Sequence, residues 1–285
     1  MTAAHAHPTS ANAPAQALIL AAGRGQRMRP LTDHCPKPLL PVRGQPLMHW
    51  AMQALAAGGF TRQVVNTAWL GEQIASYFGT NPASNGSSKL SKEDQIHIRW
   101  SAEGIDFGHA LETAGGLSRA LPLLDEVFWV SAGDVFAPDF PFTAAAVQRF
   151  AASGLLAHLW LVPNPPHNPA GDFALGDGLA GTATLGAADN VRRALNQPAR
   201  AGELRHTFST IALYRRALFE PPWCHIPPGN PQGVVAPLAP LLRAAIAAGR
   251  VSAELYTGVW VDVGTPERLA QINSPSWNPL LEPHA

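Results

Sequence analysis

The segment that most constrains the fold is a turn rich in glycine and arginine that follows a short apolar run near the start of the chain. The run, residues 17–22, reads Ala-Leu-Ile-Leu-Ala-Ala and predicts a strand that is buried on both faces. The turn, residues 23–32, contains Arg24, Arg27 and Arg29 among its glycines. Glycines allow backbone N–H groups to approach phosphate oxygens closely, and arginines neutralise those oxygens. The segment therefore favours an α/β sheet with a polyphosphate-binding turn at the end of one strand.

Two common phosphate-binding motifs do not fit this turn. A dinucleotide fingerprint needs a third glycine where this chain has Met28, and a P-loop needs a Gly-Lys-Ser/Thr sequence that the turn lacks. Lys37 follows between Pro36 and Pro38, and flanking prolines restrict the backbone and fix the direction in which the lysine projects. Taken singly, the segment also fits an ordinary tight turn, and Lys37 an ordinary surface lysine. Together they favour a site in which Arg27 and Lys37 bind phosphates and stabilise charge.

Strand-like and helix-like patterns alternate along the first half of the chain. Beyond the first strand we expect strands at 63–67, 96–100 and 127–132, helices at 47–57, 70–78 and 114–124, and loops at 81–92 and 103–110. The helix at 114–124 is expected to begin at the paired glycines Gly115 and Gly116. This alternation indicates a Rossmann-like, doubly wound, mostly parallel sheet, whose ligands bind beyond the carboxyl ends of the strands.

The second half has a different pattern, with prolines crowded at 163–169. Here we expect strands at 155–162, 207–214 and 259–263, a helix at about 235–248, and a last helix opened by Thr265 and Pro266. The sheet is therefore predicted to be mixed. A domain boundary near residue 150 and a single domain over 17–275 both fit, with a disordered leader at 1–16 and a tail at 276–285.

Charge and composition exclude several classes of protein. Lys plus Arg and Asp plus Glu both total 20 of the 285 residues, so no net field attracts nucleic acid or an anionic membrane. Cys35 and Cys224 are too few and too far apart for a zinc site or a disulfide framework, which favours a cytoplasmic location. No apolar run reaches about 18 residues, the minimum for a spanning helix. We expect a soluble protein, and a monomer, because no extra helical or repetitive tail offers an assembly surface.

Several motifs together resemble the sugar-phosphate nucleotidyltransferase family. The first is the apolar strand and its turn, followed by Pro-Lys-Pro-Leu-Leu-Pro-Val at 36–42. The others are Val-Asn-Thr-Ala-Trp-Leu-Gly at 65–71, Leu-Glu-Thr-Ala-Gly-Gly at 111–116, Thr-Phe-Ser at 207–209 and Trp-Val-Asp-Val-Gly-Thr-Pro at 260–266. They run along nearly the whole chain. The resemblance implies the nucleotidyltransferase fold, with a nucleotide-binding half at about 17–150 and a sugar-binding half at about 151–275.

Two aspartates lie at the ends of predicted strands and are the expected metal ligands. Asp134 follows the strand at 127–132, and Asp262 interrupts the apolar strand Val-Trp-Val-Asp-Val. An aspartate after a strand is often only a turn residue or a helix cap, but a carboxylate inside an apolar strand needs a cation or several donors. A transfer between two phosphate-bearing substrates also needs a hard cation. The resemblance implies that Asp134 and Asp262 hold Mg²⁺.

The resemblance also assigns the substrate contacts. It implies that the nucleoside is bound by Leu20, Ala21, Ala22, Gly23, Gly25, Asn66 and Gly115, and the sugar by Gly171, Glu203 and residues 207–210. An asparagine at a strand end and a glutamate in a loop also have ordinary structural explanations. The loop at 103–110 is longer than usual in the family, and Thr210 stands where glycine is commoner, so both bear on sugar specificity.

The implied reaction joins a nucleoside triphosphate to a sugar 1-phosphate and releases pyrophosphate. The resemblance favours UTP and N-acetylmuramic acid 1-phosphate, the substrates of bacterial cell-wall sugar recycling. GTP with mannose 1-phosphate, and a thymidine or uridine triphosphate with glucose 1-phosphate, stay open as alternatives. A non-catalytic sensor of nucleotide sugars is a further alternative, although a sensor has no need of Arg27, Lys37, Asp134 and Asp262 together.

Overall fold

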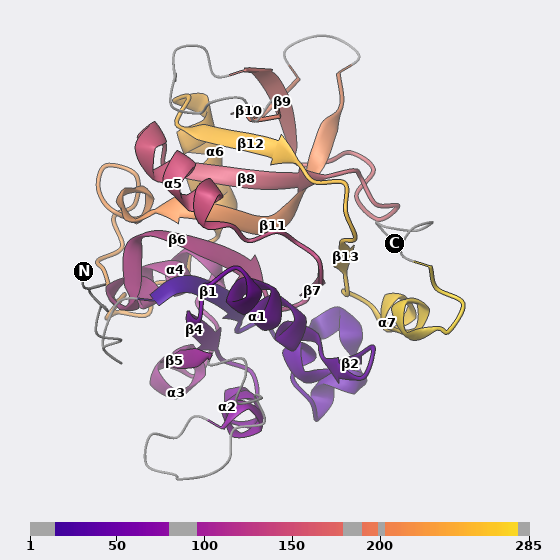
Figure 1. Cartoon of the computed structure of the whole chain (residues 1–285). Helices are drawn as coiled ribbons and strands as arrows, with labels where there is room; N and C mark the ends of the chain where they lie inside the picture. Colours follow the sequence, from indigo (N-terminus) through magenta and orange to yellow (C-terminus); the bar gives the residue numbers. More distant parts are fainter. Residues whose placement is uncertain (1–14, 80–95, 179–189, 199–202, 279–285) are drawn as a thin grey trace, which may run out of the picture.

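A mixed sheet forms the centre of the computed structural model, which describes residues 15–79, 96–178, 190–198 and 203–278 (Figure 1). The strand order in this part of the chain is β5-β4-β1-β6-β11-β8-β12-β10-β9. These strands are β1 (Ala15–Ala21), β4 (Arg62–Thr67), β5 (His97–Ala102), β6 (Leu124–Ala132), β8 (Ala157–Val162), β9 (Phe173–Gly178), β10 (Arg192–Leu195), β11 (Arg205–Arg215) and β12 (Val251–Leu255). The order confirms the predicted mixed α/β fold.

Helices cover both faces of this sheet. They are α1 (Leu47–Ala57), α2 (Gly71–Phe78), α3 (Glu103–Phe107), α4 (Glu112–Ala120), α5 (Ala144–Ser153), α6 (Leu238–Ala247) and α7 (Pro266–Asn273). Alternate residues of β1 show the two layers. Leu18 packs in a core with side chains of α4 and α6, whereas Ile19 packs in a second core with side chains of α1 and α5. Burial on both faces explains why this strand is a continuous apolar run.

The direction of the strands changes in the middle of the sheet. Strands β5, β4, β1 and β6 are parallel to one another, so their carboxyl ends meet at one edge. Strand β11 runs antiparallel to both β6 and β8, and β12 runs parallel to β8. Two short pairs lie outside this sheet: β2 (Pro41–Val42) with β3 (Gln45–Pro46), and β7 (Val135–Phe136) with β13 (Val261–Asp262).

Several predicted elements agree closely with the structure, and others are corrected by it. The helix expected at 47–57 is α1, and the helix opened by Thr265 and Pro266 is α7, with Thr265 as its cap. The predicted strand at 259–263 is only the two residues of β13, which pair with β7 instead of the main sheet. The loop expected at 103–110 contains the short helix α3. Helix α5 and strands β9, β10 and β12 were not predicted. The loop expected at 81–92 lies outside the described residues.

The helix predicted to begin at Gly115 and Gly116 begins earlier, at Glu112, and ends at Ala120. Both glycines lie inside the helix, at positions that have no room for a side chain. A Cβ atom at Gly115 would lie 2.4 Å from the backbone oxygen of Val234, and one at Gly116 would lie 2.5 Å from Oε1 of Glu103. The glycines therefore allow close packing of α4 instead of marking its start.

The first and last residues of the folded part differ from the bounds that the sequence predicted. Strand β1 begins at Ala15, two residues before the predicted start, while residues 1–14 of the expected leader lie outside the described part. At the other end, Trp277 is buried and packs edge-on against Phe136. The domain therefore includes at least the beginning of the segment that was predicted to be a tail.

Candidate active site

A cavity of about 920 Å³ opens beyond the carboxyl ends of β1, β4 and β6. Its lining includes most of the residues that the sequence placed in the site: Leu20, Ala21, Ala22, Gly23, Gly25, Arg27, Lys37, Asn66 and Asp134. The antiparallel part of the sheet, the segment leading into α6 and α6 itself supply further lining residues: Asp172, Phe173, Phe208, Thr210, Tyr214, Val235, Pro237, Leu238, Leu242 and Arg243. The cavity is large enough for two substrates.

Lys37 and Asp134 line this cavity and meet the second predicted metal ligand, Asp262, which is not part of the lining. Nζ of the buried Lys37 donates a hydrogen bond of 2.6 Å to Oδ2 of Asp134 and lies 4.0 Å from Oδ1 of Asp262. The pairing of β13 with β7 produces this arrangement, because it sets Asp262 opposite Val135, the neighbour of Asp134. Asp134 and Asp262, about 130 positions apart in sequence, are thereby placed around one cation, the Lys37 ammonium.

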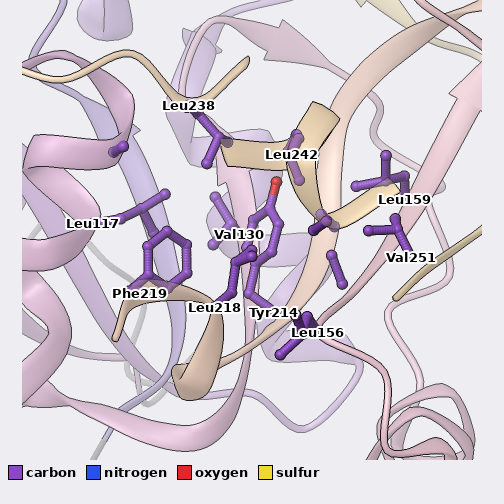
Figure 2. Close-up of a cluster of buried hydrophobic side chains, with 14 of the residues drawn as sticks. Leu117, Val130, Leu156, Leu159, Tyr214, Leu218, Phe219, Leu238, Leu242 and Val251 are labelled. Carbon is purple, nitrogen blue, oxygen red and sulfur yellow. The ribbon is translucent and has the colours of Figure 1, made fainter. Parts of the chain in front are cut away.

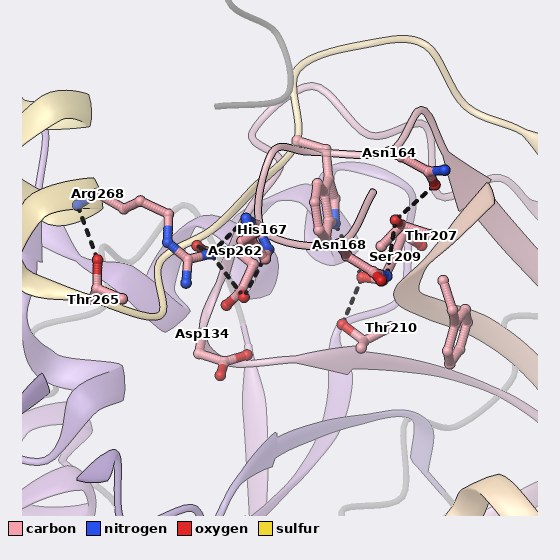
Figure 3. A network of polar contacts seen from close by, with 12 residues as sticks. Asp134, Asn164, His167, Asn168, Thr207, Ser209, Thr210, Asp262, Thr265 and Arg268 are labelled. Atoms are coloured by element: carbon pink, nitrogen blue, oxygen red, sulfur yellow. Dashed lines mark hydrogen bonds and ion pairs between the residues drawn. The ribbon is translucent and has the colours of Figure 1, made fainter. Parts of the chain in front are cut away.

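Two further side chains hold Asp262 from its other side, as Figure 3 shows. Arg268 donates from Nη1 to Oδ2 of Asp262 over 3.0 Å and to its backbone oxygen over 2.7 Å. Nε2 of His167 lies 3.5 Å from the same Oδ2. Burial, and then the nearby Arg268 guanidinium, lower the pKa of His167, which favours its neutral form. The sequence contained no signal for His167, whereas Arg268 lies in the first turn of a predicted helix close to Asp262.

The three arginines of the turn have different surroundings: Arg24 and Arg27 line the cavity, and Arg29 does not. Arg24 donates to the backbone oxygen of Thr32 and to Asp33, and it stacks on the ring of Trp69. Arg29 pairs with the same carboxylate of Asp33. Hydrogen bonds from Arg24, and then from Arg29, lower the pKa of Asp33. Both arginines therefore stabilise the shape of the turn.

Arg27 is the arginine of the turn that remains available to a ligand. It is exposed and lines the cavity, and its Nη2 lies close to Gly264. A Cβ atom at Gly264 would lie 3.1 Å from Nη2 of Arg27 and 3.1 Å from Oδ2 of Asp262. The absence of a side chain at Gly264 lets Arg27 approach the acidic pair.

Asn66 lines the cavity and belongs to a buried network in its wall. Its Oδ1 accepts from the backbone N–H of Ala21 over 2.8 Å, and its Nδ2 donates to Oε1 of Glu103 over 2.7 Å. Oε2 of Glu103 accepts from the backbone N–H of Leu111 over 2.8 Å. Burial raises the pKa of Glu103, although these hydrogen bonds oppose the shift. The Asn66 amide is thus used mainly within the protein, where it ties β1 to β4 and α3.

Three predicted substrate-binding residues lie outside the cavity lining. Gly115 donates its backbone N–H to Ala236 and packs against the segment before α6. Gly171 has φ +61° and lies against the backbone of Arg205, where a Cβ atom would be 2.7 Å away. Glu203 is exposed. The residue next to Gly171, Asp172, does line the cavity, and the structure thereby adds it to the candidates.

The expected sugar-side strand reaches the cavity through Phe208 and Thr210. Asp172 accepts from the backbone N–H of Phe208 over 2.8 Å, which links β9 to β11 at the cavity wall. Thr210 has φ +62°, a left-handed conformation that is strained for a β-branched residue. Thr210 therefore has the backbone conformation that favours glycine, the residue commoner at this position. Its threonine side chain lies in the cavity wall.

An apolar wall extends the cavity toward α6. Figure 2 shows Val130, Tyr214, Leu238 and Leu242 in one cluster, with the Tyr214 hydroxyl directed toward α6. Burial raises the pKa of this hydroxyl, so it is neutral and can act as a donor. Arg243 follows Leu242 on α6, is exposed, and lines the cavity. In the described part of the chain, no acidic side chain pairs with its guanidinium.

Neither a ready-made metal-binding cluster nor a membrane-spanning helix occurs in the described ranges. No group of three or more His, Cys, Asp or Glu side chains is arranged there to hold a metal ion by itself. A cation at Asp134 and Asp262 would therefore need ligands from substrate or water. None of the helices in these ranges is long and apolar enough to cross a membrane.

The chain is similar in sequence to known proteins along most of its length. Residues 16–171 match the sequence model of the family described as nucleotidyl transferase. The chain is 42% identical to the N-acetylmuramate alpha-1-phosphate uridylyltransferase of Neisseria meningitidis serogroup B over 92% of this chain and 99% of that protein. A protein of the same name from Caulobacter vibrioides is 32% identical over 50% of this chain and 53% of its own length.

The solved structures show the same fold at low sequence identity. A putative glucose-1-phosphate thymidylyltransferase from Bacillus anthracis has a TM-score of 0.66 at 19% identity, covering 90% of this chain and 93% of that one. A UDP-glucose pyrophosphorylase from Acinetobacter baumanii has a TM-score of 0.66 at 14% identity, covering 95% and 98%. The mixed sheet with helices on both faces is therefore shared with sugar nucleotidyltransferases.

Proposed function

The chain belongs to the nucleotidyl transferase family, and we propose that it transfers a uridylyl group from UTP to N-acetylmuramate 1-phosphate with release of pyrophosphate. The similarity to the meningococcal enzyme along almost the whole of both chains supports these substrates. The observation that carries the reaction type is the meeting of Lys37, Asp134 and Asp262 at a cavity that Lys37 and Asp134 line together with the glycine-rich turn.

The reaction is a direct displacement at the α-phosphorus of UTP. A phosphate oxygen of the sugar 1-phosphate forms the new P–O bond, and the bond from the α-phosphorus to the bridging oxygen of pyrophosphate breaks. Because the attacking oxygen is already ionised, no general base is needed. Catalysis consists of positioning and charge stabilisation. Arg27 and the backbone N–H groups of Gly23 and Gly25 hold the triphosphate, and Lys37 stabilises charge on the reacting phosphates.

Magnesium is the cation that we propose for Asp134 and Asp262. Oδ2 of Asp134 and Oδ1 of Asp262 both face the Lys37 ammonium, so their oxygens already converge on a positive charge. Carboxylate oxygens supplemented by phosphate and water are the ligands that Mg²⁺ prefers. When bound, the ion would supply neutralisation of the triphosphate charge. Arg268 occupies Oδ2 of Asp262 and thereby leaves Oδ1 turned toward Lys37.

The second substrate has two anionic groups, a 1-phosphate and the carboxylate of its lactyl ether. The cavity contains Arg27 and Lys37 at one place and Arg243 on α6 at another. We assign Arg27 and Lys37 to the phosphates and Arg243 to the lactyl carboxylate, because a guanidinium binds a carboxylate through paired hydrogen bonds. The apolar wall of Phe173 and Phe208 suits the methyl groups of the acetamido and lactyl substituents.

A substrate panel tests this function. Purified protein is incubated with Mg²⁺ and UTP, GTP or dTTP against the 1-phosphates of N-acetylmuramic acid, N-acetylglucosamine, glucose and mannose. Pyrophosphate release is measured, and the product is identified by mass spectrometry. We expect the highest kcat/KM for UTP with N-acetylmuramate 1-phosphate. A higher kcat/KM for GTP with mannose 1-phosphate would mean that these are the substrates instead of UTP and N-acetylmuramate 1-phosphate. Nucleotide-sugar binding with no pyrophosphate release in any pairing would identify a sensor.

A further inference from the structure

Glu112 has a backbone conformation that is unusual for its residue type. It is the first residue of α4 and has φ +61°, in the left-handed region where glycine is favoured. An L-residue in this region raises the free energy of the folded state unless a local interaction offsets it. No helix cap is made by the Glu112 side chain, so the conformation has no such local explanation.

The surrounding hydrogen bonds hold the backbone on both sides of Glu112. On one side, the N–H of Leu111 donates to the buried Glu103 over 2.8 Å, and the oxygen of Leu111 accepts from the N–H of Ala236 over 3.0 Å. On the other side, the N–H of Gly115 donates to the oxygen of Ala236 over 3.1 Å. The left-handed conformation at Glu112 is therefore imposed by its neighbours, and glycine would adopt it at lower cost.

The Glu112 side chain lies in the wall of the cavity. It is exposed, and no described residue forms a hydrogen bond or ion pair with its carboxylate. It adjoins Leu111, which Glu103 and Asn66 connect to Ala21 at the end of β1. An ionised carboxylate only accepts hydrogen bonds and repels phosphates. Its chemistry therefore fits the nucleoside part of a nucleotide, which has N–H and O–H donors.

We propose that Glu112 binds the nucleoside by accepting a hydrogen bond from an N–H of the base or a hydroxyl of the ribose. This proposal rests on the proposed function only in that the cavity binds a nucleoside triphosphate. It also gives a physical reason for a glutamate at a position whose backbone suits glycine. The Glu112 side chain that would bind the substrate therefore lowers the stability of the substrate-free protein.

The first test separates stability from binding with the variant Glu112→Gly. Removing the side chain relieves the backbone strain, so the melting temperature should rise by about 2–4 °C. It also removes the acceptor, so the Kd for UTP, measured by titration calorimetry, should rise about tenfold or more. Glu112→Ala removes the same acceptor but keeps the strain, so it should weaken UTP binding without raising the melting temperature. UTP binding at wild-type affinity by both variants would overturn the proposal.

Two nucleotide analogues identify the donor. If a ribose hydroxyl is the donor, wild type should bind 2′-deoxy-UTP or 3′-deoxy-UTP as weakly as Glu112→Gly binds UTP. If the N3–H of uracil is the donor, wild type should bind both deoxy analogues like UTP but discriminate against CTP, whose N3 is an acceptor, and Glu112→Gly should lose that discrimination. Equal losses for every nucleotide in the Glu112 variants, with no dependence on either donor, would contradict a direct contact.

Arg43→Gly is the matched control. Arg43 also has a left-handed backbone, with φ +49°, and it is exposed and does not line the cavity. We expect this variant to bind UTP like wild type. The test needs only a wild-type protein that binds a triphosphate, so it can fail while the proposed transfer reaction stands. Conversely, a wild-type protein that bound UTP but released no pyrophosphate would refute the reaction and leave the binding role of Glu112 intact.

Discussion

Lys37 and Asp134 are 97 positions apart in the sequence, yet Nζ of Lys37 lies 2.6 Å from Oδ2 of Asp134. Asp262 completes the group at 4.0 Å from the same nitrogen. Two carboxylates so close together repel each other unless a cation stands between them. Lys37 therefore has a role in the free protein, where it neutralises the acidic pair, in addition to its proposed contact with phosphates.

Replacing Lys37 by methionine should affect both activity and stability. The long apolar stem is kept while the charge is lost. We expect kcat to fall by about 10²–10³-fold, as for other donors that stabilise a transition state. The free energy of unfolding in urea should fall by about 1–2 kcal/mol, less than for a fully buried pair because the Asp134 side chain is 40% exposed.

Arg29→Met is the control for this variant. Arg29 pairs with Asp33 on the outer side of the turn and does not line the cavity. Its loss should leave kcat within about twofold of wild type, since an exposed ion pair contributes little. A wild-type kcat in Lys37→Met would show that Lys37 does not stabilise charge during the reaction.

The elements of the site could be predicted from the sequence, but their contacts could not. Strand β1 and its turn are recognisable because the apolar run and the glycines are contiguous. Asp262 is conspicuous because it interrupts an apolar strand, yet its distance from Asp134 depends on the pairing of β13 with β7, which no local pattern encodes. Arg24 shows the same limit, since a partner nine positions away and the ring of Trp69 decide its direction. Glu103 lies in a five-residue helix, too short to show a helical period.

Removal of divalent cations should abolish pyrophosphate release. We expect a chelator to stop the reaction of wild-type protein and added Mg²⁺ to restore it, because Asp134 and Asp262 are proposed to share the ion. Asp262→Asn weakens one ligand while Arg268 can still contact the side chain, so the Mg²⁺ concentration for half-maximal rate should rise about tenfold or more. Turnover that persists in excess chelator, or an unchanged Mg²⁺ requirement in Asp262→Asn, would contradict the proposed metal site.

Arg243 should distinguish two substrates that differ only in the lactyl group. Arg243→Gln removes the positive charge and keeps a polar side chain on α6. We expect kcat/KM for N-acetylmuramate 1-phosphate to fall by about 10–100-fold, in line with a charged hydrogen bond of about 1.5–3 kcal/mol. N-acetylglucosamine 1-phosphate lacks the carboxylate, so its kcat/KM should change little. An equal decrease for both sugars would mean that Arg243 does not contact the lactyl group.

The buried carboxyl of Glu103 should make stability depend on pH. Burial raises the pKa of Glu103 above its ordinary value of 4.5, so the folded protein retains this proton at pH values where the unfolded chain has lost it. The stability that follows from proton binding is therefore complete below pH 4.5 and is lost as the pH rises through the raised pKa.

Glu103→Gln cannot ionise and isolates this contribution. The variant also loses one of the two acceptor oxygens used by Asn66 and Leu111, so it should be less stable than wild type at the low end of the range. As the pH rises from about 4.5 to 7, wild type alone must ionise a buried group, so the stability difference between the two proteins should narrow. Urea unfolding at several pH values measures the difference. A constant gap, or one that widens with pH, would show that Glu103 titrates no higher in the folded protein than in the unfolded chain.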